Sequence, residues 1–168
     1  MRITLTLLAF LFSCWFINIG LNGLYVLKKY FSYFRFVDKP LDFKFVVGDG
    51  YRLLGESTTW FGLIVAFLLG LLIGVTNYFT PLEGVVLGLG VYIGHALGSF
   101  IKRRLGFADG KFLPIVDHAD SVFTAGVFMI FLGLVSWKVV IFSTFITIVL
   151  QPAWNYFWFR LGFRRNPL

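Results

Sequence analysis

The sequence is poor in charged residues, and acidic residues are the scarcer kind. Only 14% of the 168 residues are charged and 8 are acidic, whereas 58% are apolar and 22 are phenylalanine. This balance excludes a disordered tail, a collagen-like chain and a nucleic-acid-binding tail. A soluble domain of this size could not bury so much apolar surface. The composition therefore predicts a protein embedded in a lipid bilayer.

Cysteine and histidine are also scarce. The single cysteine, Cys14, excludes an intrachain disulfide. The two histidines, His95 and His118, have no further His or Cys to complete a ligand set, which argues against a zinc site. The apolar run around Cys14 lacks a small-residue cleavage site after a short core, so we expect it to be kept as a helix.

Five apolar stretches are long enough, or nearly so, to cross ~30 Å of hydrocarbon, which takes about 20 helical residues. They lie near residues 3–27, 60–79, 82–101, 121–136 and 138–158. Two of the connections are minimal, which predicts antiparallel hairpins, and only 28–59 and 102–120 are large loops. We therefore expect an all-α membrane protein in which residues 1–168 form a single domain, a polytopic bundle of five transmembrane helices.

The basic residues predict the orientation of this bundle. With five spans, the two large loops and the C-terminal tail fall on one side of the membrane, and they carry thirteen of the fifteen Lys and Arg residues, including Arg35, Arg164 and Arg165. Only Arg2 and Lys138 fall on the other side. Because basic loops stay inside, we expect the N-terminus outside and the C-terminus in the cytoplasm.

The acidic residues gather on the same side. Seven of the eight lie in the cytoplasmic loops or at their edges, and only Glu83 lies outside. A mixed cluster of carboxylates and cations at a membrane surface suits a metal–polyphosphate site. A set of solvated loops with anchoring cations explains the same pattern, and both interpretations stay open at this point.

Glycines line one face of the third stretch. Gly90, Gly94 and Gly98 repeat at intervals of four, an arrangement that lets helices approach closely in lipid. We interpret this face mainly as a packing surface. The functional alternative is that the third helix lies at the centre of the bundle and leaves room for a substrate near its cytoplasmic end.

Two segments that lead into or out of the spans carry polar residues that are candidates for a functional site. In residues 49–62, Glu56 falls near a helix N-terminus, which stabilises a carboxylate, and Trp60 suits an interfacial anchor. In residues 94–106, His95, Ser99 and Lys102 share one helix face. His95 would lie ~10 Å inside the hydrophobic boundary, where an ionisable group is a functional candidate, although a neutral imidazole bonded to a neighbouring helix fits as well.

A third segment enters the fourth span with a pair of aspartates. Asp117 and Asp120 are three residues apart, so on a helix they project from one face and can share a divalent cation. The alternative is an N-cap at Asp117 with Asp120 complementing the helix dipole.

Together these segments resemble the CDP-archaeol synthase family, a compact membrane branch related to CDP-diacylglycerol synthases. The resemblance rests on Ser-Phe-Ile-Lys-Arg-Arg-Leu-Gly at 99–106, then Pro114, then Asp117-x-x-Asp120. Upstream, Gly55-Glu56-x-x-Thr59-Trp60-x-Gly62 is similar to the other loop motif of the family. The resemblance covers essentially the whole chain.

The resemblance implies an enzyme that transfers CMP from CTP to a membrane lipid phosphate, of archaetidic or phosphatidic acid type, with Mg²⁺ as cofactor. It implies that Asp117 and Asp120 bind the metal and that these two residues and Lys102 are catalytic. The other residues that it assigns to substrate binding are Ser99, Arg103, Arg104, Asp42, Arg52, Glu56, Thr59, Trp60 and His95. The active site would lie on the cytoplasmic face of the cell membrane. Oligomers are possible, and no nucleic acid is expected as a partner.

The chain makes three departures from the usual family pattern: one at His95, one in the first loop motif and one in the aspartate pair. The family usually has Asp, Lys and Arg where this chain has His95, Thr58 and Phe61, and the family's Asp-Gln-x-Asp reads Asp-His-Ala-Asp here. The alternative hypothesis is therefore a catalytically impaired membrane homologue that binds anionic lipid or nucleotide without turnover.

Overall fold

The computed structural model describes residues 2–31, 38–76, 78–108, 111, 113 and 116–160. Within these residues it contains five helices and no strand beyond two isolated β-bridges. The helices are α1 (Arg2–Tyr30), α3 (Trp60–Gly74), α4 (Pro81–Arg104), α5 (Val116–Phe131) and α6 (Trp137–Arg160). Arg35, Pro114, Arg164 and Arg165, which entered the sequence argument, lie outside the described residues.

Three of these helices are long and apolar enough to cross a membrane: α1, α4 and α6. The apolar α3 has 15 residues and spans ~22 Å, which is less than the hydrocarbon thickness of ~30 Å, and α5 has 16 residues. The predicted all-helical membrane fold is therefore confirmed in its class.

The helix boundaries differ from the predicted spans where capping residues intervene. The helix α3 ends at Gly74, just before Thr76, whose hydroxyl donates to the carbonyl of Ile73 at 2.6 Å. The helix α4 begins at Pro81, with a capping box between Thr80 and Glu83. At the other end, α4 continues to Arg104, so the basic triplet belongs to its last turn, where cations complement the helix dipole. The helix α5 begins at Val116, which places both aspartates inside it.

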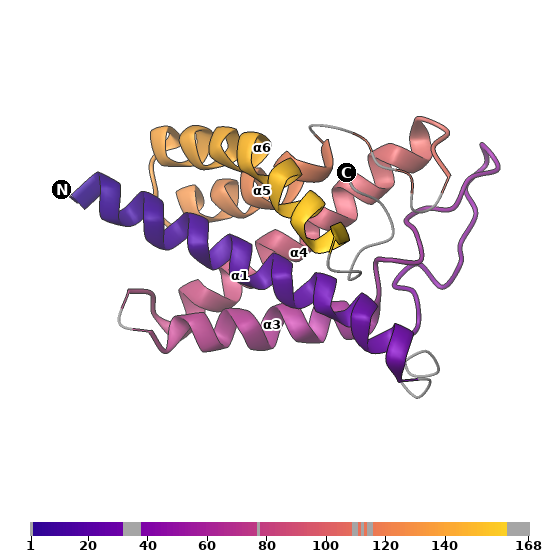
Figure 1. Ribbon diagram of the computed structural model, residues 1–168, viewed down its shortest axis with the longest axis horizontal. Coiled ribbons are helices and arrows are strands. Elements are labelled where there is room, and N and C mark those ends of the chain that lie inside the picture. Colours follow the sequence, from indigo (N-terminus) through magenta and orange to yellow (C-terminus); the bar gives the residue numbers. More distant parts are fainter. Residues whose placement is uncertain are drawn as a thin grey trace.

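The helix α4 lies in the middle of the bundle, between α3 on one side and α5 on the other (Figure 1). Glycines allow these contacts. A Cβ added at Gly84 would collide with the backbone of Gly70 on α3, and one added at Gly90 would lie 2.8 Å from the Cα of Ala125 on α5. The interpretation of the glycine-rich face as a packing surface is thus confirmed.

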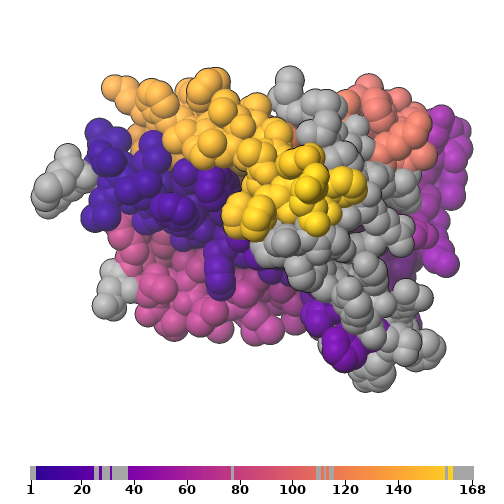
Figure 2. Space-filling view, in the orientation of Figure 1, coloured from indigo at the N-terminus to yellow at the C-terminus, as the bar shows by residue number. Residues whose placement is uncertain are grey.

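Helices α1 and α6 close one face of the molecule. Figure 2 shows α1 in indigo crossing this face, with α6 on one side of it and α3 on the other. Trp15 of α1 donates from its indole nitrogen to the hydroxyl of Thr147 on α6 at 3.1 Å. The core beneath contains Phe10, Ile17, Leu87 and Met129, all fully buried.

The connections gather at the two ends of the bundle (Figure 1). The N-terminus of α1, the turn between α3 and α4, and the turn between α5 and α6 lie at one end. The segment 38–59 and the C-terminal turn of α4 lie at the other end, and this second end carries most of the predicted site residues.

Candidate active site

An ion pair joins α4 to α5 at the second end of the bundle. The ammonium of Lys102 donates to the carboxylate of Asp117 at 2.6 Å, and their side chains are 13% and 17% exposed. The other carboxylate oxygen of Asp117 accepts from the backbone N–H of Leu113 at 2.7 Å. The first turn of α5 is therefore fixed against the last turns of α4.

Asp120 lies one turn further along α5, directly against Gly98 of α4. A Cβ at Gly98 would collide with the carboxylate of Asp120, and a Cβ at Gly94 would collide with the backbone of residue 120. One oxygen of the carboxylate accepts from the backbone and the hydroxyl of Ser121, at 2.9 Å for the hydroxyl. The glycine at position 98 thus makes the space in which this carboxylate lies.

On α4, Ser99 is buried and connects to the segment before α3. The hydroxyl of Thr58 donates to that of Ser99 at 3.3 Å, and both residues are almost completely buried. The predicted face of His95, Ser99 and Lys102 is present, with His95 half-buried one turn deeper than Ser99. The sequence analysis named Thr58 as a departure from the family pattern but did not assign it to the site, although its place beside Thr59 in the loop motif was a usable signal.

Thr59 and Trp60 lie at the start of α3. Thr59 caps the helix by accepting from the backbone N–H of Gly62 at 3.1 Å, and its carbonyl accepts from the hydroxyl of Tyr92 on α4. Trp60 is 43% exposed at the first turn of α3, as expected for an interfacial anchor, and packs against Phe43.

The carboxylate of Asp42 organises the segment 38–59. It accepts from the guanidinium of Arg52 at 2.7 Å and from the backbone N–H groups of Lys44 and Leu54 at 3.0 and 3.1 Å. Burial alone would raise the pKa of Asp42, but these hydrogen bonds and the Arg52 charge outweigh it and lower that pKa below its usual value. Asp42 therefore holds the loop together as an anion.

Arg104 docks this loop onto the end of α4. Its guanidinium donates to Asp49 at 2.7 Å and to the carbonyl oxygens of Arg52 and Tyr51 at 2.6 and 3.4 Å. It also lies 5.3 Å from the ring centre of Phe100. The sequence analysis included Asp49 only as the start of the segment 49–62 and did not predict this long-range pair.

Two further predicted site residues, Arg103 and Glu56, lie at the same end of the bundle, the first buried and the second exposed. Arg103 is 5% exposed and donates to the carbonyl of Ala108, just after α4. Glu56 is exposed, with one oxygen 3.8 Å from the guanidinium of Arg52. The structure thus brings Lys102, Asp117 and Asp120 together on the facing surfaces of α4 and α5, and it places Glu56 at the rim.

These carboxylates could hold a metal ion only with help from a substrate. Among the described residues, no three His, Cys, Asp or Glu side chains form a group suited to a metal ion. Two carboxylates together with phosphate oxygens and water suit Mg²⁺, which usually binds proteins through one or two carboxylates plus substrate phosphates.

Comparison with known proteins identifies the family. The family model described as CarS-like CDP-archaeol synthase matches residues 80–167 of this chain. This range includes Lys102, Asp117 and Asp120. The chain belongs to the CDP-archaeol synthase family.

Relatives match over most of the chain. The CDP-archaeol synthase of Sulfolobus acidocaldarius is 34% identical over 134 residues, covering 76% of this chain and 82% of that protein. The one of Thermococcus kodakarensis is 34% identical over 158 residues, covering 85% and 92%. The solved structure of an intramembrane enzyme for archaeal membrane lipids biosynthesis is similar to 88% of this chain and 90% of its own, with a TM-score of 0.67 and 25% identity.

These matches confirm the resemblance that the sequence motifs indicated. They also confirm that the chain is an enzyme of the lipid cytidylyltransferase class and a membrane protein.

Proposed function

We propose that this enzyme transfers CMP from CTP to a membrane lipid phosphate of the archaetidic or phosphatidic acid type, forming a CDP-lipid for phospholipid biosynthesis. The observation that carries the proposal is the convergence of Lys102, Asp117 and Asp120 at one end of the bundle, in a chain related to CDP-archaeol synthases. Cations and carboxylates at the end of apolar helices suit a reaction between a polar nucleotide and a lipid headgroup.

The transfer needs no covalent intermediate on the protein. An oxygen of the lipid phosphate attacks the α-phosphorus of CTP, the new P–O bond forms, and the bond from the α-phosphorus to the bridging oxygen breaks. Pyrophosphate leaves with the electron pair of that bond. Catalysis of such a step consists of positioning the two phosphates and neutralising their charge.

Asp117 and Asp120 are the residues that would hold Mg²⁺ in this site. They are adjacent on the inner face of α5, and Gly98 leaves room for the Asp120 carboxylate. When bound, the ion would supply a Lewis acid that neutralises charge on the phosphate oxygens.

The basic end of α4 would bind the phosphates. Lys102, held by Asp117, and the buried Arg103 would neutralise their negative charge, and the hydroxyl of Ser99 would donate a hydrogen bond. In the segment 42–60, which would shape the nucleotide pocket, Arg52 and Arg104 already bind the loop itself. Their contribution would be to hold that pocket in place.

The site would face the cytoplasm, with five helices crossing the membrane and the N-terminus outside. The charge pattern supports this orientation, because thirteen of the fifteen basic residues belong to segments on one side of a five-span chain. The segment 38–59 and the basic turn of α4 lie at the end of the bundle opposite the N-terminus (Figure 1).

The experiment follows the label of CTP into products. Purified protein in detergent receives Mg²⁺, a lipid phosphate and CTP labelled at either the α- or the γ-phosphate. The proposal predicts that the α-label enters the lipid and that the γ-label is released as pyrophosphate. Offering phosphatidic acid and its unsaturated ether counterpart side by side identifies the preferred lipid. Binding of CTP without any labelled lipid would instead support the catalytically impaired homologue.

A further inference from the structure

The segment 41–54 exposes large apolar side chains outside the helices. Phe43 is 72% exposed and Phe45 is 62% exposed. Phe43 and Lys44 both have positive φ angles, 47° and 66°, which are uncommon for residues other than glycine. A loop surrounded by water would gain nothing from holding its backbone in this way while exposing two phenylalanines.

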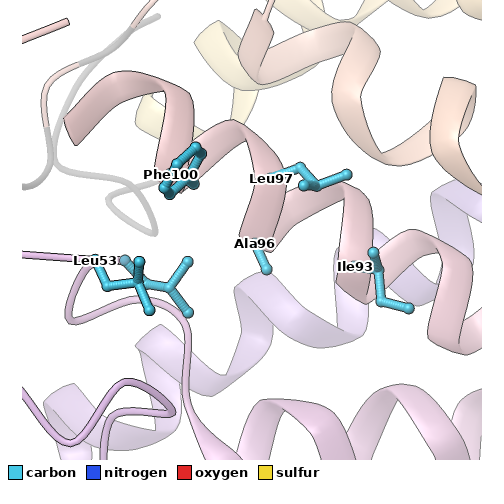
Figure 3. A pocket seen from close by; sticks show the side chains of 6 residues that line it. Leu53, Ile93, Ala96, Leu97 and Phe100 are labelled. Atoms are coloured by element: carbon cyan, nitrogen blue, oxygen red, sulfur yellow. The ribbon is translucent and has the colours of Figure 1, made fainter. Parts of the chain in front are cut away.

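This segment lies beside an apolar face of α4. Leu53 and Leu54 line a groove of about 320 Å³ together with Ile93, Ala96, Leu97 and Phe100 of α4 (Figure 3). These four α4 residues share one side of a helix that is long and apolar enough to cross a membrane. Because a helix rises 1.5 Å per residue, Leu97 lies ~10 Å from the basic end at Arg104. The loop therefore reaches the depth of the membrane-spanning surface.

Backbone pairing shows which side chains share one side of the loop. The N–H of Leu53 donates to the carbonyl of Phe45 at 2.9 Å, and Val46 forms an antiparallel bridge with Arg52. Side chains alternate between the faces of paired extended segments, so Phe45 shares the face of Leu53, while Val46 lies on the opposite face. Phe43 packs against Trp60, with ring centres 6.0 Å apart, at the point where the apolar helix α3 begins.

The polar groups of the loop are largely satisfied within the protein, and its exposed cations suit a lipid surface. Asp42 accepts three hydrogen bonds and Asp49 pairs with Arg104. Lys39 and Lys44 are exposed beside the phenylalanines, where they complement anionic lipid headgroups.

We propose that the exposed side chains of Phe43 and Phe45 on this loop are seated in the headgroup and outer acyl layer of the surrounding bilayer. The partner is bilayer lipid, continuous with the lipid that covers α3 and the exposed face of α4. The inference rests on the membrane location of the chain and is independent of the proposed transfer reaction.

The test measures the depth of single nitroxide labels on the full chain in nanodiscs of phosphatidylcholine and phosphatidylglycerol. In a Cys14→Ala background, labels are placed with Phe45→Cys and, as the matched control on the opposite face, Val46→Cys, which is 53% exposed. Leu97→Cys gives the lipid reference, and Glu56→Cys, where the native side chain is 80% exposed and lies outside segment 41–54, gives the water reference. Collision rates with oxygen and with a soluble nickel chelate are compared at each position.

The proposal predicts that the ratio of oxygen to nickel accessibility at Phe45 resembles that at Leu97 and is severalfold higher than at Val46. Nickel accessibility at Phe45 equal to that at Glu56 would place the loop in water and overturn the proposal. Protection of Phe45 from both reagents would show that protein covers it, a second copy of the chain or another polypeptide, and would overturn it too. Since no step involves CTP, neither outcome depends on whether the enzyme turns over.

Discussion

The ammonium of Lys102 lies 2.6 Å from the carboxylate of Asp117, which joins the last turns of α4 to the first turn of α5. A cation near the C-terminus of one helix and an anion near the N-terminus of the next also complement both helix dipoles. This pair fixes the junction at which the proposed reaction occurs, and Asp120 lies one helical turn away from it.

Removing the cation at this junction should impair catalysis strongly. We expect Lys102→Met to lower kcat/KM for CTP by about 10²–10³-fold, because both the phosphate partner and the partner of Asp117 are lost. Lys102→Arg, which keeps the charge, should retain an intermediate activity. Initial rates of CDP-lipid formation measure the effect. A methionine variant as active as the wild type would contradict the role assigned to Lys102.

Adding one methyl group at Gly98 should displace the Asp120 carboxylate. The added Cβ would collide with that carboxylate, so we expect Gly98→Ala to lower kcat by about 10²-fold through misplacement of a catalytic group. Gly23→Ala is the matched control, because a Cβ there meets nothing within 4 Å. Equal rates for the two variants would show that the position of Asp120 does not matter for turnover.

Arg104 should stabilise the protein more than its ion-pair partner does. Asp49→Asn removes one exposed ion pair and should cost at most about 1 kcal/mol. Arg104→Gln also removes donors to two carbonyl oxygens, so we expect it to cost about 1 kcal/mol more. Unfolding free energies in detergent give both values. A larger loss of unfolding free energy for Asp49→Asn than for Arg104→Gln would mean that the hydrogen bonds from Arg104 to the carbonyl oxygens contribute nothing.

The loop around Asp42 should loosen in acid. The pKa of Asp42 is lowered in the folded protein, so its stabilising effect is complete above about pH 4, the range of an unperturbed aspartate. The effect is lost as the pH falls through the lowered pKa. Hydrogen–deuterium exchange of the peptide 41–54, corrected for intrinsic rates, should therefore be faster in Asp42→Asn than in the wild type at neutral pH. The difference should shrink below about pH 4. A difference that persists unchanged in acid would contradict the anionic role.

The sequence predicted the positions of the five described helices, because a long apolar run is enough to indicate each of them. It missed the early end of α3 and the early start of α5, where the hydroxyl of Thr76 bonds the last turn of α3 and Asp117 bonds Lys102 and the backbone of Leu113. The face of His95, Ser99 and Lys102 followed directly from helical spacing.

Long-range side-chain pairs could not be predicted in the same way. Neither the docking of Arg104 on Asp49 nor the bond between Thr58 and Ser99 follows from spacing, because each joins segments more than 40 residues apart. Both pairs connect the segment before α3 to α4, and only the folded chain reveals them.

The most direct test of the proposed function is a time course of CDP-lipid formation by the purified protein at increasing Mg²⁺ concentration. The wild type is compared with Asp120→Asn, and CTP binding is measured for both. We predict Mg²⁺-dependent product from the wild type and its loss in Asp120→Asn. No product from the wild type, even after His95→Asp, Thr58→Lys and Phe61→Arg restore the usual family residues, would contradict the proposed transfer.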